Sequence, residues 1–364
     1  WNAAYFTNKL YSIFRHSTAK TGELEMKTSK RAQSKIDFVV LWVDSSDKEW
    51  RKEKEKYTKN INDTINMDNR SQRYRDWENF QYWFRGVEKF APWVNKVHLV
   101  TCGHTPTWLN TTHPKLNIVK HSDFMPANSL PTFNSNAIEL CIHKIPGLSE
   151  QFVLFNDDMF LTKPVKPTDF FKNGRPVNTM ALFAIMPTAS NGFYKTVANN
   201  LTIIDKYFSF DEFKKKNLLK ILSIKQCEWI IFTYPLLIYN RFVGFRNYHI
   251  AISYMKKTFS TIWEKEPDML MQTVNSRVRD YNRNVSHWLC NYWQFASGNF
   301  EQRNAHFGTS IAINDKKAQS YISRQKYHIL CLNDVDDIEN PEAVKREILR
   351  SLNIILPEKS TYEA

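Results

Sequence analysis

Residues 36–44 read IDFVVLWVD, a nearly continuous run of large apolar and β-branched residues that ends in an acid. Strands of this composition are typical of parallel sheets, in which both faces of a strand are buried. The segment EQFVLFNDD, residues 150–158, repeats the pattern and ends in two adjacent acids. KVHLVT and KLNIVKHSD are further strands, and helices are predicted over residues 74–94 and 136–145. This alternation predicts an α/β fold, with helices covering a mostly parallel sheet.

The rest of the chain divides by composition. Residues 1–35 are predicted to be a basic arm with amphipathic character, either packed on the domain or in contact with a membrane surface. Residues 36–179 carry the α/β core. From about residue 180 to 300 the sequence is mainly helical, with lysine-rich and aromatic helices predicted over residues 210–234 and 248–267. Residues 301–364 return to the core with a strand at 326–334 and a helix opened by Pro341.

Charge and cysteine content narrow the class of protein. The formal charge of +13 indicates an anionic partner. Nucleic acid is disfavoured, because the chain has neither zinc-finger spacing nor an RNA-binding signature. Five scattered cysteines without a C-x-x-C pair indicate a reducing compartment rather than a disulfide framework. No apolar run is long enough to span a bilayer.

Acids recur where the predicted strands end. They are Asp44, the pair Asp157 and Asp158, and Asp334. In α/β sheets of this kind, ligands bind beyond the carboxyl ends of the strands. Carboxylates placed there suit Mg²⁺ or Mn²⁺, which share coordination with substrate phosphates. The alternative is that each acid caps a turn, but its recurrence at three strand ends favours a site for a metal and a diphosphate.

Four segments resemble the conserved regions of the Stealth family, and they occur in the family's order. They are IDFVVLWVDSSDKEW, the stretch from YRDWENF to TPTWLN, the stretch from LPTFNSNAIEL to FNDDMF, and CLND. The family includes bacterial capsule polymerases that transfer hexose-1-phosphate. The resemblance implies a Rossmann-like (GT-A-like) core that binds a nucleotide sugar, and a helical insertion that binds the acceptor. It also implies that an acceptor hydroxyl attacks the phosphorus next to the sugar of a UDP-sugar, so that a phosphodiester forms and UMP leaves.

Site residues follow from the matched motifs. Asp158 is implied as the main metal ligand, with Asp157 beside it, and Glu139 as an active-site acid. His249 matches a helix-borne histidine that acts as general base or acid, although a structural role is the commoner one for a lone histidine. Arg279 is implied to stabilise the transferred phosphoryl group, and Arg277 is the competing choice. The implied nucleotide contacts are Asp44, Arg75, Asn134, Asn136 and Asp334, of which Asp334 is also a possible metal ligand.

The expected function is a capsular polysaccharide polymerase that transfers N-acetylglucosamine-1-phosphate, with N-acetylmannosamine-1-phosphate as the alternative. Its expected partners are the UDP-N-acetylhexosamine donor and an anionic oligosaccharide acceptor, held in part by Lys214, Lys215, Lys216, Lys256 and Lys257. The expected location is the bacterial cytoplasm, at the inner face of the membrane. Two other classes stay open: a non-catalytic polyanion-binding module, and an ordinary glycosyltransferase that releases UDP.

Overall fold

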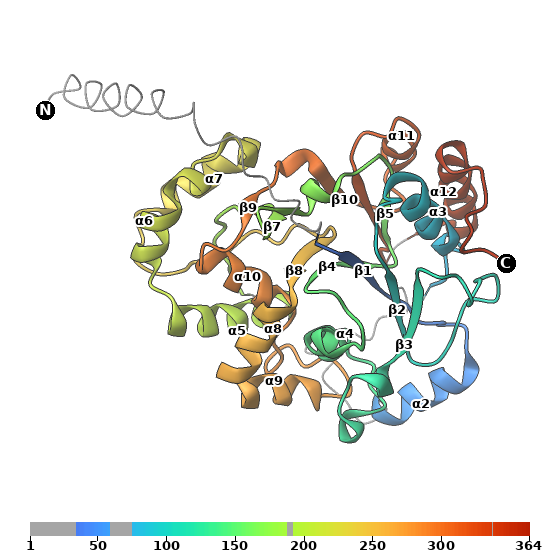
Figure 1. Ribbon diagram of the computed structural model, residues 1–364, viewed down its shortest axis with the longest axis horizontal. Helices are drawn as coiled ribbons and strands as arrows, with labels where there is room; N and C mark the ends of the chain where they lie inside the picture. The colour runs from blue at the N-terminus through green and yellow to red at the C-terminus, as the bar shows by residue number, and fades with distance from the viewer. Residues whose placement is uncertain (1–33, 59–74, 188–191, 337) are drawn as a thin grey trace, which may run out of the picture. The chain divides into compact units, whose positions relative to one another are not determined.

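The structure is a computed structural model, and it describes residues 34–58, 75–187, 192–336 and 338–364 (Figure 1). Residues 35–364 form one compact unit. The predicted basic arm lies outside the described residues except for Ser34 and Lys35. The five cysteines are all free thiols. The functional division of the chain at residues 180 and 300 stays a prediction.

A five-stranded sheet in the order β3-β2-β1-β4-β8 forms the centre of this unit. The first four strands in that order are parallel, and β8 is antiparallel to β4. The prediction of an α/β fold with a mostly parallel sheet is therefore confirmed. The strands span Ile36–Leu41 (β1), Val97–Thr101 (β2), Leu116–Lys120 (β3), Gln151–Asn156 (β4) and Ile252–Met255 (β8).

Helices pack on both faces of this sheet because its strands are apolar on both sides. In β1, Phe38 and Val40 enter one hydrophobic core and Val39 enters the other. The core around Phe38 includes the helices α3 (Phe80–Phe90), α11 (Ala318–Ser323) and α12 (Pro341–Ile355). The core around Val39 includes α4 (Ser135–Cys141), α5 (Gly192–Tyr207), α6 (Phe210–Ile221), α8 (Lys256–Lys265), α9 (Pro267–Val274) and α10 (Trp288–Ala296). The predicted helix over residues 74–94 is confirmed only for Phe80–Phe90, and the predicted C-terminal helix from Pro341 is confirmed.

The prediction of one helix over residues 248–267 is wrong for its first part. Ile252–Met255 form β8, and only from Lys256 does the chain become helical. The cause is tertiary, because β8 pairs with the edge of β4 and places Ile252 and Tyr254 in the same core as Phe152. Packing at a sheet edge overrides the local pattern of such a short segment.

The predicted helix over residues 210–234 is interrupted. It consists of α6, a 3₁₀ segment η6 (Ile224–Trp229) and α7 (Ile230–Leu236). Within η6 the backbone of Cys227 has φ 54°, which is not helical. Three shorter helical segments therefore replace one long helix in this region, and Figure 1 shows α6 and α7 at the left of the view.

Two small sheets complete the unit. In one, β11 (Ile329–Asn333) lies between β10 (Gly308–Ala312) and β5 (Met159–Leu161). The other has the order β6-β7-β9, formed by Phe171–Lys172, Arg175–Asn178 and Glu301–Gln302. The predicted strand at residues 326–334 is confirmed as β11, which is antiparallel to β5 with Cys331 opposite Met159. The C-terminal part of the chain thereby reaches the turn between β4 and β5.

Candidate active site

The loops at one edge of the central sheet carry most of the predicted site residues. Because β8 is antiparallel to β4, it begins at the edge where β4 ends. Asp158 follows β4 by two residues and His249 precedes β8 by three, so the two loops face each other. His249 is in a loop and not on a helix, which corrects the expected helix-borne histidine.

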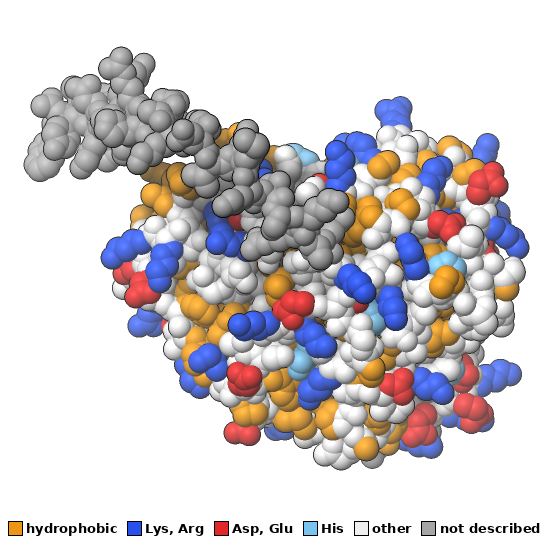
Figure 2. Space-filling model, viewed as in Figure 1, with side chains coloured by type: hydrophobic (Ala, Val, Ile, Leu, Met, Phe, Trp, Pro, Cys, Tyr) orange, Lys and Arg blue, Asp and Glu red, His pale blue; other side chains and the backbone are white. Residues whose placement is uncertain are grey.

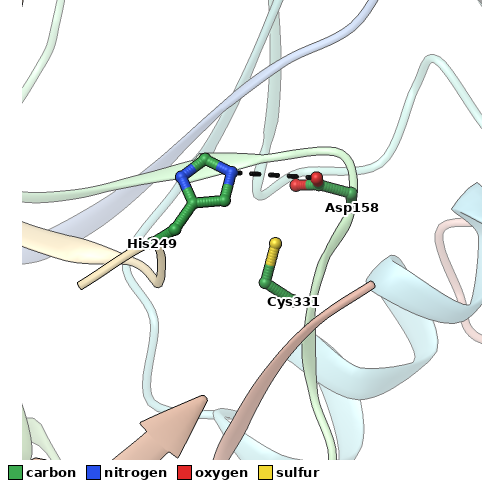
Figure 3. A group of neighbouring side chains, drawn as sticks. All are labelled: Asp158, His249 and Cys331. Atoms are coloured by element: carbon green, nitrogen blue, oxygen red, sulfur yellow. Dashed lines mark ion pairs between the residues drawn. The ribbon is translucent and has the colours of Figure 1, made fainter. Parts of the chain in front are cut away.

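Asp158 and His249 form the centre of this arrangement (Figure 3). Nε2 of His249 lies 3.9 Å from Oδ2 of Asp158. The thiol of Cys331 lies with them, and the ligand atoms of the three side chains are all within 4.8 Å of one another. Burial raises the pKa of the Cys331 thiol well above its usual value, so the thiol is neutral. Oδ1 of Asp158 is buried and has no hydrogen-bond partner among the described residues.

The two adjacent acids fit a hard divalent cation. Burial, and secondarily the charge of Asp158, raise the pKa of Asp157 to about 7. Two carboxylates this close repel each other, and a cation would relieve both this repulsion and the unpartnered Oδ1 of Asp158. Oxygen ligands suit Mg²⁺ or Mn²⁺, whereas a neutral thiol such as that of Cys331 does not. In the described residues Asp157 is not part of the cluster that Asp158 forms with His249.

Asp44 lies in the turn after β1. Its Oδ1 accepts hydrogen bonds from the backbone nitrogen of Ser46 at 2.8 Å and from the hydroxyl of Ser46 at 2.6 Å. Burial raises the pKa of Asp44, but the hydrogen bonds from Ser46 outweigh it and hold the pKa below its usual value. The side chain is thus a carboxylate at neutral pH and lies at the sheet edge. It also caps the turn after β1, which was the alternative role considered for the strand-end acids.

Arg75 and Asp334 contact each other. Nη1 of Arg75 lies 3.1 Å from Oδ1 of Asp334, and the indole nitrogen of Trp77 donates to Oδ2, also at 3.1 Å. Burial raises the pKa of Asp334 despite these two partners. The charge of the neighbouring Asp76 contributes to the raised pKa of Asp157, so this loop also lies close to the paired acids.

Glu139 and His287 form a second buried pair beside this centre. Glu139 lies on α4 and is 5% exposed, and Nε2 of His287 is 3.8 Å from its Oε2. On the other side of the ring, Nδ1 of His287 lies 2.8 Å from the hydroxyl of Tyr254. Burial, followed by the charges of His249 and Arg279, lowers the pKa of His287 to about 3. The imidazole is therefore neutral near pH 7.

The two competing arginines have different surroundings. Nη2 of Arg279 donates to the hydroxyl of Ser135 at the start of α4, at 2.6 Å. The guanidinium of Arg277 instead donates to the backbone carbonyl oxygens of Pro131 at 2.7 Å and Asn128 at 2.9 Å. Arg277 thus holds a loop, whereas Arg279 lies close enough to His287 to lower its pKa.

Asn134 has a local role in the fold. It is fully buried, and its side-chain oxygen caps α4 by accepting from the backbone nitrogen of Asn136 at 3.1 Å. Its amide nitrogen donates to the side-chain oxygen of Asn284 at 2.9 Å. These bonds occupy both ends of the amide, so Asn134 positions α4 and the loop that carries Arg279. Asn136 is partly exposed.

Three residues of the site were not predicted from the sequence: Tyr254, His287 and Cys331. His287 directly precedes the buried aromatic helix α10, and nothing in that local pattern distinguishes it from a structural histidine. Cys331 belongs to the quoted CLND segment, but a buried thiol next to a strand-end acid gives no sequence signal of its own. The antiparallel pairings of β8 and β11 bring Tyr254 and Cys331 into the site, and His287 enters it from the start of α10.

Comparison with known proteins identifies the family. The sequence models of Stealth conserved regions 1 and 2 match residues 34–61 and 73–178. WcwK, a capsular polysaccharide phosphotransferase of Streptococcus pneumoniae, is 41% identical over 330 residues, which cover 90% of this chain and 98% of the relative. WefC, a receptor polysaccharide phosphotransferase of Streptococcus oralis, is 40% identical over 344 residues, 91% of this chain and 99% of the relative. Among solved structures, the galactosyltransferase LgtC superposes with a TM-score of 0.39 at 10% identity, over 89% of this chain and 97% of that chain.

The chain belongs to the Stealth family, as its four segments predicted. It is a phosphotransferase, which excludes the alternative of a non-catalytic polyanion-binding module. In the described part of the chain, no helix is both long and apolar enough to cross a membrane.

Proposed function

We propose that this protein is a capsular polysaccharide phosphotransferase that moves an N-acetylhexosamine-1-phosphate, N-acetylglucosamine-1-phosphate first of all, from a UDP-sugar to a hydroxyl of a growing anionic chain. Each transfer forms one phosphodiester and releases UMP. The location that goes with this function is the bacterial cytoplasm at the inner face of the membrane. The similarity to relatives such as WcwK, a capsular polysaccharide phosphotransferase, supports phosphotransfer in capsule synthesis.

The observation that carries the proposal is the pairing of Asp158 with His249 at the sheet edge. A carboxylate with an unpartnered, buried oxygen lies beside a half-exposed imidazole at 3.9 Å. The first group suits a cation that binds a diphosphate, and the second suits proton transfer from a hydroxyl. Both are needed where a sugar hydroxyl attacks a phosphorus atom.

In this mechanism the donor diphosphate lies over the turn that carries Asp157 and Asp158. His249 accepts the proton from the acceptor hydroxyl as its oxygen bonds to the phosphorus next to the sugar. The bond from this phosphorus to the bridging oxygen breaks, and the electron pair leaves with UMP. Arg279 stabilises the negative charge on the phosphoryl oxygens, and Glu139, which touches His287, keeps that side of the site in place.

A divalent cation held by Asp158, with Asp157 and Asp334 nearby, would neutralise the diphosphate and stabilise the leaving UMP. The residues of this chain suit such an ion through their oxygen atoms. Mg²⁺ and Mn²⁺ are the ions whose ligand preference matches this set.

The test uses the purified full chain, a short phosphosugar acceptor, Mg²⁺, and either UDP-N-acetylglucosamine or UDP-N-acetylmannosamine. The nucleotide product is identified by chromatography for the wild type and for Asp158→Ala. Release of UMP that disappears in Asp158→Ala supports phosphosugar transfer at this site. The donor that gives UMP fixes the sugar, and a wild type that releases no nucleotide from either donor would overturn the N-acetylhexosamine assignment. Release of UDP instead would overturn the proposal in favour of glycosyl transfer.

A further inference from the structure

Exposed apolar side chains are concentrated in one short part of the chain. Of the twelve large hydrophobic residues that are exposed in the described part of the protein, nine lie between residues 218 and 239. Single exposed apolar residues are common on protein surfaces, but such a concentration marks an interaction site. We call it the α6–α7 surface, and it consists of Leu218, Leu219, Leu222, Ile224, Ile231, Phe232, Tyr234, Ile238 and Tyr239.

The helices expose these residues because their other faces already fill the core. α6 buries Phe210, Phe213 and Ile221, which recur at helical spacing. Its opposite face carries Leu218 and Leu219, and Leu219 is 90% exposed. In α7 only Thr233 is buried, although most of the helix is apolar. The exposed apolar residues of α6 and α7 therefore do not contribute to the hydrophobic core of the described fold.

Basic residues lie among these apolar ones. Residues 211–241 contain six lysines and arginines against three acids. The exposed Lys225 donates to the backbone carbonyl oxygen of Gln302, which bears no net charge, so this bond leaves its positive charge uncompensated. In Figure 2, orange and blue side chains lie close together along the edge where Figure 1 places α6 and α7.

This combination selects one class of partner. A polyanionic polysaccharide accounts for the lysines, but not for Leu219, Ile224 and Ile238, which are 82–90% exposed. An anionic bilayer accounts for both, because apolar side chains enter the acyl boundary while lysines contact the headgroups. The exposed aromatic residues Phe232, Tyr234 and Tyr239 are of the type found at the membrane–water interface.

We propose that the α6–α7 surface docks this protein on the surface of an anionic lipid bilayer, without spanning it. The proposal does not depend on which sugar is transferred. Trp229, which directly precedes α7, links the docking surface to the active site. The guanidinium carbon of Arg246, three residues before His249, lies 3.3 Å from the centre of the Trp229 ring. The ring of Trp229 also contacts that of Tyr248, which immediately precedes His249. Docking therefore places the reacting groups close to the membrane surface.

The test is co-sedimentation of the full chain with vesicles of phosphatidylcholine alone or mixed with phosphatidylglycerol. The variant is the triple substitution Leu219→Gln, Ile224→Gln and Ile238→Gln. The control is Ile354→Gln, because Ile354 is also exposed, at 61%, but lies on α12. We expect the wild type and the control to bind the mixed vesicles. The affinity of the triple variant for these vesicles should be lower by a factor of about ten or more. Circular dichroism and transferase activity without vesicles should be equal in all three.

A second variant tests the charges. Lys215→Gln with Lys216→Gln should weaken binding to the mixed vesicles and leave binding to phosphatidylcholine unchanged. Binding of the triple variant at the wild-type level would overturn the proposal. The double variant Phe6→Ser with Phe14→Ser tests the N-terminal arm. If this variant loses vesicle binding while the triple variant still binds, the arm is the anchor and the proposal is overturned. If the wild type does not bind vesicles but forms a dimer, and the triple variant is a monomer, the α6–α7 surface binds a second copy of the chain instead.

Discussion

The hydroxyl of Tyr254 lies 2.8 Å from Nδ1 of His287, and on the opposite side of the ring Nε2 faces Glu139 at 3.8 Å. A lone pair on Nε2 would repel the carboxylate, so the hydrogen of the neutral imidazole lies on Nε2. Nδ1 then accepts the hydrogen bond from Tyr254, whose pKa is raised by burial so that the phenol stays protonated. Glu139 thus sets the tautomer of a histidine that the sequence did not single out, and Tyr254 is the partner of its unprotonated nitrogen.

The first prediction concerns this hydroxyl. Tyr254→Phe leaves a buried nitrogen of His287 without a partner, which should lower the free energy of unfolding by about 1–3 kcal/mol. The value of kcat should fall and KM should change little, because Tyr254 acts through His287 and not on the substrate. Denaturant unfolding and steady-state kinetics measure both. Tyr82→Phe is the control, because among the described residues the hydroxyl of Tyr82 makes only a 3.5 Å contact, with Asn353.

The second prediction separates the two histidines. His249→Gln removes the proposed base from a half-exposed position, so kcat should fall about 100-fold or more with almost unchanged stability. His287→Gln alters a buried ring and should lower stability as well as activity. Thermal unfolding and kcat measured side by side test this difference. Equal activity of His249→Gln and the wild type would remove His249 from the mechanism.

The third prediction separates Arg279 from Arg277. Arg279→Gln should lower kcat about 100-fold, because a cation near the phosphoryl oxygens is lost, and should leave the folded state in place. Arg277→Gln should lower the free energy of unfolding by about 1–3 kcal/mol, because two carbonyl oxygens lose their charged donor. The opposite pattern of kcat and unfolding would exchange the roles of the two residues.

The fourth prediction concerns the metal. Activity should disappear with a chelator and return with Mg²⁺ or Mn²⁺, and Asp158→Asn should lower kcat at least about 100-fold at any ion concentration. Cys331→Ser should keep this dependence on Mg²⁺, because the neutral, buried thiol is not expected to be a ligand. Direct binding of Mn²⁺, followed by its electron paramagnetic resonance signal, distinguishes lost binding from lost catalysis. A Cys331→Ser variant that no longer binds Mn²⁺ would show that the thiol takes part.

The fifth prediction concerns stability in acid. Burial lowers the pKa of His143 to about 4, whereas an unfolded histidine titrates near 6.5. Between these values the unfolded state binds the extra proton, so the free energy of unfolding falls as the pH drops from about 6.5 to about 4. One such group changes stability by on the order of 3 kcal/mol over this window. His143 stacks on Phe259, and His143→Phe should flatten this part of the stability curve in denaturant unfolding at several pH values. An unchanged slope would mean that His143 does not contribute.

The features of the fold that follow from strand composition could be predicted from the sequence. β1 and β4 carry nearly continuous runs of apolar residues, as is typical of strands covered on both faces, and the acids that follow them place the site at one edge. β8 could not be predicted, because its four residues pair with an edge that exists only in the folded sheet. The local pattern of its first residues continues into the amphipathic helix α8, and this favoured a helix throughout.

The candidate site was predictable to a similar degree. Asp158 and His249 were identified by motif, and the structure brings them together. The motif match did not indicate that the side chain of Asn134 caps a helix, or that Arg75 contacts Asp334. His287 was not identified, because its two partners, Tyr254 and Glu139, are distant from it in the sequence and the local pattern gives no sign of them.

The antiparallel register of β8 on β4 aligns Leu154 with Ile252, although nearly a hundred residues separate them in the chain. The segment between these strands leaves and re-enters the fold at neighbouring points of one sheet edge. It is therefore a natural cassette for chimaeras between members of the family. An exchange that preserves both strands would transplant Asp158 and His249 together with the intervening helices, and the β4–β8 pairing would still hold the two loops that carry them opposite each other.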